Sequence, residues 1–153
     1  MDDRMFRNAM GQFATGVTVI TTAIDDEVHG MTANAFMSVS LSPKLISVSI
    51  DDRAQMKEKI NQSGKFSVSI LSEKQQEMSM YFAGQIKEKR DIDFKWVNGI
   101  PVLKDSLANI ICNVYASHQA GDHTLYIGEV IDLQLVEGTP LAFYKGKYGK
   151  IVS

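Results

Sequence analysis

Apolar and polar positions alternate along much of the chain with a period of two residues, which is typical of half-buried β-strands. β-branched residues are frequent in the same runs and favour strands further. The pattern predicts strands at residues 17–24, 44–50, 65–71, 106–121 and 123–138. An acidic turn at 25–27 leads from the first run into a second strand at Val28, so a hairpin is expected there.

A helical period appears in only a few short stretches. Residues 3–14 place Met5, Phe6, Ala9, Met10 and Phe13 on one stripe, with Asp2 or Asp3 positioned to cap the first turn. One or two helical turns are expected at 54–60. Residues 73–83 begin with an acidic, polar turn and predict a further helix that ends near Gly84.

The turn signals complete the fold prediction. Asn98 and Gly99 in "VNGI" tolerate the two positive φ angles of a type I′ turn, so two strands are expected to meet there. The tail at 140–151 predicts one short strand and a Gly-rich loop. Seven or eight strands with two or three short helices favour an antiparallel barrel or sandwich over a parallel sheet with βα repeats. We expect one domain over residues 1–153.

Composition and charge narrow the class of protein. A chain that is 44% apolar and 22% charged suits a globular domain, and a net charge of −2 offers no basic surface for nucleic acid or an anionic membrane. The first ten residues lack the features of a signal peptide, and no apolar run approaches the roughly 18 residues that span a bilayer. The lone Cys112 cannot form an internal disulfide. A cytoplasmic protein is expected.

Familiar catalytic signatures are missing from the sequence. Cys112, His118 and His123 follow no established zinc spacing, so no metal site is expected. There is no G-x-G-x-x-G after a strand, and "GKYGK" at 146–150 lacks the spacing and the hydroxyl of a P-loop. No G-x-S-x-G motif is present, and Cys112 lies in an apolar strand where a buried thiol is usual.

The stretch "HGMTANAFMSVSL", residues 29–41, is unusually rich in small and hydroxylated side chains for a strand region. A planar ligand with a phosphate tail needs backbone amides and short donors along its edge, because large side chains would hold the ring away. The alternative is that small residues simply let two sheets approach closely. The periodicity of the sequence leaves both interpretations open.

Several motifs in a fixed order resemble a known family. They are "FATGVTVITT", "HGMTANAFMSVSL", a following strand that ends in "SID", "FAG", "AGDHTLYIGEV" and "FYKGKYG". Over residues 3–150 this order resembles the short-chain flavin reductases, the reductase components of two-component flavin-dependent monooxygenases of the phenol 2-hydroxylase and 4-hydroxyphenylacetate 3-monooxygenase type. The resemblance implies a split β-barrel and a homodimer that passes electrons from NADH to FAD or FMN. The reduced flavin would serve a partner oxygenase that hydroxylates an aromatic substrate such as a phenol.

The resemblance also assigns cofactor-binding residues, segment by segment. The isoalloxazine and ribityl groups would be lined by Thr32, Ala33, Asn34, Ala35, Ser38 and Val39. The ribityl and phosphate end would pass Ser49, Ile50, Asp51 and Arg53, and the tail would be covered by Phe82, Ala83 and Gly84. This chain has "RAQM" where many relatives have a hydroxyl beside the phosphate. Arg53 is therefore the first basic residue expected to bind the flavin phosphate, and Lys87, Lys89 and Arg90 are the alternatives.

The residues expected near the nicotinamide are His123 in "GDH" and the pair Lys147 and Tyr148 in "GKYG". Hydride moves between the two cofactors, so the protein has to supply stacking and alignment and to exclude water. We expect His123 to orient the nicotinamide and not to act as an obligatory acid. Two other functions on a similar barrel are considered: a non-catalytic flavin-binding carrier or sensor, and a pyridoxamine-phosphate oxidase, which should demand more cationic phosphate ligands than this chain places.

Overall fold

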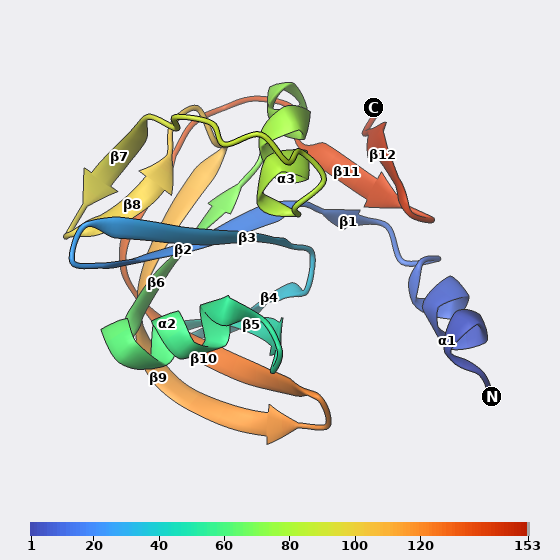
Figure 1. Ribbon diagram of the computed structural model, residues 1–153, viewed down its shortest axis with the longest axis horizontal. Helices are drawn as coiled ribbons and strands as arrows, with labels where there is room; N and C mark the ends of the chain where they lie inside the picture. The colour runs from blue at the N-terminus through green and yellow to red at the C-terminus, as the bar shows by residue number, and fades with distance from the viewer. Residues whose placement is uncertain (153) are drawn as a thin grey trace.

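The computed structural model describes residues 1–152, and strands make up most of it (Figure 1). The helices are α1 (Asp3–Met10), α2 (Gln55–Ser63), the 3-10 turn η1 (Glu73–Gln75) and α3 (Gln76–Phe82). The strands are β1 (Thr15–Gly16), β2 (Thr18–Ile24), β3 (Glu27–Ala33), β4 (Phe36–Leu41), β5 (Lys44–Asp51), β6 (Lys65–Ile70), β7 (Phe94–Val97), β8 (Ile100–Leu103), β9 (Ala108–Ala120), β10 (His123–Leu135), β11 (Leu141–Tyr144) and β12 (Lys147–Lys150).

One antiparallel sheet of seven strands forms the body, in the order β3-β2-β6-β9-β10-β5-β4. Its two edge strands, β3 and β4, follow each other in the chain with only Asn34 and Ala35 between them. The sheet therefore has to curl until its edges approach, although they do not pair. The result is a split β-barrel, so the expected mainly β class is confirmed.

The core fills the inside of this curled sheet. Its largest fully buried side chains include Ile20, Ile50, Phe66 and Tyr126, and α2 adds Met56 and Ile60 at one end. β2 and β6 are buried on both faces because the β7–β8 hairpin covers them from outside. There the hydroxyls of Thr21 and Ser67 donate to the carbonyl of Pro101 at 2.6 and 3.0 Å. This double burial explains why "VTVITTAI" is almost continuously β-branched.

Two of the expected hairpins have the predicted turn chemistry. Asn98 and Gly99 have φ angles of 52° and 76° between β7 and β8, as a type I′ turn requires. Asp25 and Asp26 have φ angles of 49° and 67° between β2 and β3. Aspartate tolerates this left-handed region better than most residues, so the acidic turn forms as predicted.

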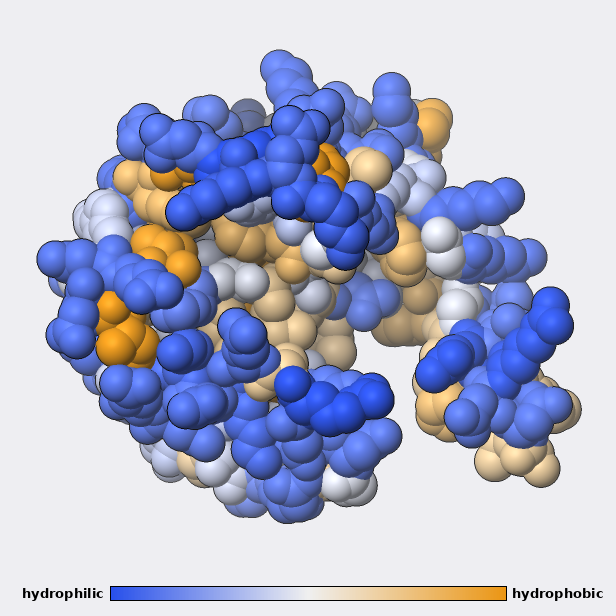
Figure 2. All heavy atoms as spheres, viewed as in Figure 1, coloured by the Kyte–Doolittle hydropathy of each residue, from blue (hydrophilic) through white to orange (hydrophobic). Residues whose placement is uncertain are grey.

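The first helix is shorter than predicted. The Asp2 carboxylate accepts the Met5 amide at 2.7 Å and caps the helix start, as expected. The helix ends at Met10 and not at residue 14, because Gly11 caps it and the amide of Phe13 turns back to the Met10 carbonyl at 3.1 Å. None of its residues is buried, and α1 stands apart from the barrel (Figures 1 and 2).

The strand count is also higher than predicted. The tail, predicted as one strand and a loop, forms the hairpin β11–β12 around Lys145 and Gly146, whose φ angles are 52° and 76°. The long run after Val28 divides at Asn34 into β3 and β4. Four-residue strands leave too short a pattern to be found from periodicity. Throughout residues 1–152, every helix falls short of the length and hydropathy that a bilayer crossing needs.

Candidate functional site

The barrel is open at the link between its two edge strands. The carbonyl of Asn34 accepts the Phe36 amide at 3.0 Å, and the carbonyl of Ala35 accepts the Ser49 amide at 3.2 Å. Both linking residues are exposed, and within residues 1–152 their own N–H groups have no hydrogen-bond acceptor. The split therefore offers free backbone donors beside small side chains, which suits a planar ligand with a polar edge.

A groove of about 1090 Å³ extends from this split toward α1. Its lining is largely apolar and includes Phe13, Phe36 and Leu125. Asn34 and Ser49 contribute polar groups to the same wall. Figure 2 shows the hollow between the barrel and the separate helix. An apolar cavity with a few convergent polar groups is the usual form of a cofactor site.

The pairing of β5 with β10 extends one wall of the groove. Ser49 pairs with Leu125, and Asp51 pairs with His123. Side chains alternate along a strand, so these four residues share one face of the sheet. Ile50 points to the opposite face and is fully buried in the core. The structure thus brings three predicted site residues, Ser49, Asp51 and His123, onto one wall. The side chain of Ile50 points away from this wall, so only its backbone can contact a ligand in the groove.

Arg53 lies at the end of this wall and is already paired. Its Nη2 is 2.8 Å from Asp51 Oδ2, and its Nε donates to Asp51 Oδ1 at 3.1 Å. These charge-assisted hydrogen bonds hold the pKa of the Asp51 carboxyl well below its usual range. The Arg53 side chain is 88% exposed. A phosphate that binds Arg53 would have to share it with Asp51 or displace that carboxylate.

A polar cluster that the sequence did not indicate lies beside His123. Asp52 accepts the hydroxyl of Thr124 at 2.7 Å, the Lys57 amine at 3.1 Å and the amide of Gln119. Gln119 also donates to the carbonyl of His123 at 3.1 Å. The hydrogen bonds from Thr124 and Gln119 lower the pKa of Asp52. In the sequence Asp52 is an ordinary turn residue. Only the pairing of β5 with β10 brings it beside the β9–β10 turn, where its hydrogen bonds to Gln119 and Thr124 hold that turn in place.

A smaller cavity of about 170 Å³ adjoins the groove and shares Asn34 with it. The other predicted residues on its walls are Thr32, Ala33, Ala83 and Tyr148. The structure therefore brings together parts of the "TANA", "FAG" and "KYG" segments, which lie far apart in the chain. Ser79 also lines this cavity and was not among the predicted residues.

A third hollow of about 480 Å³ lies between β3, the start of α2 and the loop after α3. The predicted residues on its walls are Phe82, Gly84, Lys87 and Lys89. Arg90 is not among its lining residues and pairs instead with Glu77 at 3.2 Å. Over the described residues, Lys87 and Lys89 form no ion pair, so their charges are available to an anion.

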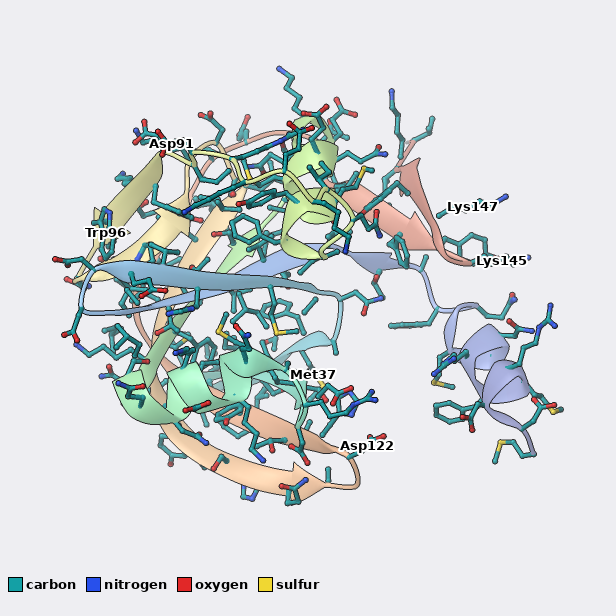
Figure 3. All side chains as sticks on the ribbon, viewed as in Figure 1. Met37, Asp91, Trp96, Asp122, Lys145 and Lys147 are labelled. Carbon is teal, nitrogen blue, oxygen red and sulfur yellow. The ribbon has the colours of Figure 1, made fainter. Side chains whose placement is uncertain are left out.

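Three predicted residues lie elsewhere. Ser38 and Val39 are exposed on β4 at a register shift and line none of these hollows. Lys147 is exposed, and Figure 3 shows it at the upper right of the molecule, whereas Asp122, the neighbour of His123, lies at the lower edge. Within one chain the terminal loop and His123 therefore do not meet. The assigned ligand roles of all these residues stay predictions.

The fold and the groove define a class of small split barrels with a cofactor-sized opening. The family model described as "Flavin reductase like domain" matches residues 10–152. The chain belongs to this family.

Individual relatives are similar to this protein along nearly the whole chain. An "NADH-dependent flavin reductase" from Rhodococcus sp is 49% identical over 145 residues, which cover 93% of this chain and 82% of the relative. The "4-hydroxyphenylacetate 3-monooxygenase, reductase component" of Thermus thermophilus is 36% identical and covers 96% and 95% of the two chains. The solved structure "Flavin reductase PheA2 in native state" is 59% identical, covers 100% of both chains and superposes with a TM-score of 0.98.

Proposed function

We propose that this protein is an NADH-dependent flavin reductase that supplies reduced FAD or FMN to a separate monooxygenase, which hydroxylates an aromatic substrate such as a phenol. The observation that carries this function is the whole-chain agreement with flavin reductases in sequence and fold. One of these relatives is by name the reductase component of an aromatic monooxygenase. The groove at the split supplies the place where the chemistry would occur.

The residues of the groove fit a flavin ring. The groove has a volume of about 1090 Å³, slightly more than the roughly 300–1,000 Å³ of ordinary cofactor pockets. Phe36 and Leu125 offer apolar surface for a flat ring system. The exposed N–H groups of Asn34 and Ala35 and the Ser49 hydroxyl can meet its polar edge.

A flavin held in this groove would supply the redox chemistry, with NADH as the electron donor. The protein has to hold their rings in contact and keep water out. Ala35 leaves the backbone open to the ring because it carries only a methyl group. His123 continues the groove wall past Leu125 and would orient the nicotinamide through its imidazole. Its Nδ1 lies 2.8 Å from Asp122 Oδ1, a contact between exposed side chains that favours one direction of the ring.

Cations around the site would hold the flavin phosphate. Arg53 is engaged by Asp51, whereas Lys87 and Lys89 line a hollow beside the "FAG" segment. This arrangement favours the two lysines over Arg53 as the first phosphate ligands. Lys87→Ala and Lys89→Ala should then weaken the binding of FMN more than the binding of riboflavin, because only FMN carries the phosphate.

The decisive experiment mixes the purified protein with FAD or FMN and NADH under nitrogen and follows the flavin absorbance band. Bleaching at many turnovers per protein supports the reductase. Bound flavin that stays oxidised supports the non-catalytic carrier. An Ala35→Leu variant should fold, since residue 35 is exposed, but it should lose flavin binding and NADH oxidation because its side chain would cover the free amides. Activity equal to that of the wild type would refute this placement of the ring.

We also propose that the protein acts as a homodimer, with α1 as part of the interface. Met5, Phe6, Met10 and Phe13 are between 53% and 79% exposed, and no residue of this helix is buried on its own barrel. A second copy would cover this apolar face and close the groove that Phe13 lines. Sedimentation should give a dimer, and a Phe6→Ser, Met10→Ser double variant should sediment as a monomer. A monomeric wild type would contradict the proposal.

The proposed setting is the cytoplasm, where NADH is available, and the proposed unit is one flavin reductase domain over residues 1–153. Cys112, buried in β9, is compatible with a reducing compartment.

A further inference from the structure

Ser79 lies in the middle of α3 and has no exposed surface. Nothing in the sequence marks it, because a serine between Met78 and Met80 is an ordinary helix residue. Its surroundings are not ordinary. It stands at the wall of the 170 Å³ cavity beside the groove, where three predicted site segments converge.

Each of these three segments makes a hydrogen bond to Ser79. The hydroxyl of Thr32 donates to the Ser79 carbonyl at 2.6 Å. The amide of Ala83 donates to the same carbonyl at 3.0 Å. The hydroxyls of Ser79 and Tyr148 are 2.7 Å apart and share a hydrogen bond in which either can donate. One residue thus joins the "TANA", "FAG" and "KYG" segments.

The hydrogen bonds cross large separations in the chain. Thr32 is 47 residues from Ser79, and Tyr148 is 69 residues away. They attach the edge strand β3 and the terminal hairpin β11–β12 to one turn of α3, an arrangement visible in Figure 1 above the split. Tyr148 is held further by an edge-on contact with Phe143, whose ring centroid is 5.4 Å away. The Phe143 contact lies within the hairpin, so the Ser79–Tyr148 hydrogen bond is what attaches the hairpin to α3, at the cavity that Ala33 and Asn34 also line.

We propose that the Ser79 hydroxyl, through its hydrogen bond to Tyr148, positions the "KYG" hairpin beside the "TANA" and "FAG" segments for flavin binding, while the main-chain carbonyl of Ser79 holds Thr32 and Ala83. The proposal rests on the proposed flavin reductase function. Ser79 has no exposed surface in the free protein, so its side chain is expected to act on flavin binding through Tyr148 and the hairpin that Tyr148 belongs to. Without the Ser79 hydroxyl, the hairpin would be looser in the free protein and would have to be ordered when flavin binds.

The test compares Ser79→Ala, Tyr148→Phe and the double variant with a matched control, Ser67→Ala. Ser67 is equally buried and also bonds to a hydroxyl, that of Thr21, but it lies under the β7–β8 hairpin and lines none of the three hollows. One hydrogen bond corresponds to roughly a two- to tenfold change in an equilibrium. Ser79→Ala should raise the KM for flavin by about that factor, with kcat at saturating flavin changed less than twofold.

The double variant should be no worse than Tyr148→Phe alone, because both changes remove the same hydrogen bond. Ser67→Ala should lower Tm while it leaves the KM for flavin unchanged. If Ser79→Ala lowers Tm but the KM for flavin stays at the wild-type value, or if the control raises KM equally, the role is purely structural and the proposal fails.

Hydrogen exchange of the flavin-free protein separates this failure from a failure of the proposed function. Ser79→Ala should speed exchange in residues 147–150 relative to both the wild type and Ser67→Ala. This faster exchange is expected even if the wild type proves unable to reduce flavin. In that case the proposed reductase function fails, but the attachment of the hairpin by Ser79 is still measured. Unchanged exchange in 147–150 would overturn the fastening itself.

Discussion

Gly30 is a position where one added methyl group should have a clear effect on both stability and the candidate site. A Cβ at residue 30 would lie 2.7 Å from Cε1 and 2.8 Å from Cδ1 of Phe82, and 3.3 Å from Cγ2 of Thr21. Ordinary contact begins at 3.4 Å, so the Phe82 ring would have to move by about 0.7 Å. The absence of a side chain at Gly30 is thus what lets the "FAG" segment lie on β3.

The cost of Gly30→Ala follows from what holds the ring. Phe82 packs edge-on against Tyr81 at 5.1 Å between ring centroids, and against Phe94 at 6.3 Å. Displacing it weakens aromatic contacts worth about 0.5–1.5 kcal/mol each, and overpacking of this kind typically costs about 1–3 kcal/mol in total. Alanine itself suits a strand better than glycine by about 0.5–1 kcal/mol. The expected net loss is about 0–2.5 kcal/mol, centred slightly above 1 kcal/mol.

Urea and thermal unfolding measure this loss, and a chain of this length should lose roughly 2–4 °C in Tm per kcal/mol. The control is Gly149→Ala, where an added Cβ meets nothing within 4 Å and φ is not positive, so stability should stay equal or rise. The KM for flavin should rise in Gly30→Ala only. In a Phe82→Ala background the same change at Gly30 should cost little. If its cost is the same with and without the Phe82 ring, the steric explanation is wrong.

Three further predictions concern charge, thiol chemistry and the nicotinamide. Arg53 lowers the pKa of the Asp51 carboxyl in the folded protein, so the ion pair stabilises the fold above the unfolded pKa of about 4, and this stabilisation is lost as the pH falls below that value. In an NMR titration, Arg53→Ala should return the Asp51 pKa toward its unfolded value. An unchanged pKa would refute the pairing. Burial raises the pKa of the Cys112 thiol to about 12, so a thiol reagent at pH 8 should react only after unfolding, and rapid labelling of the native protein would contradict this. His123→Ala should raise the KM for NADH by about tenfold, as for the loss of one good polar contact, and should slow flavin reduction; unchanged values of both would exclude the orienting role.

Much of the fold follows from local patterns. The strands β2, β5, β6, β9 and β10 and the helices α2 and α3 were predictable because each is long enough for its period to appear. The β7–β8 turn was predictable because Asn98 and Gly99 suit positive φ angles wherever the chain places them. The hairpin β11–β12 and the break at Asn34 were not predictable, since both depend on pairing with distant parts of the chain.

Some features of the candidate site could likewise be predicted from the sequence, and others could not. The order of the motifs is enough to indicate the family, and the resemblance predicts that residues 29–41 bind flavin. The sequence could not say that Arg53 is taken by Asp51, or that Ile50 faces the core. These facts depend on side-chain geometry and on which face of β5 is turned inward.

The sequence by itself determined the strand-rich class, the main turns and the family, because these properties reside in neighbouring residues and in ordered motifs. Only the tertiary structure decided that the two edges of the sheet meet at Asn34 and Ala35, and that one buried serine joins three segments. The physical reason is that hydrogen bonds and contacts between residues far apart in the chain leave no periodic trace in it. The barrel has to close before Thr32, Ser79 and Tyr148 can meet.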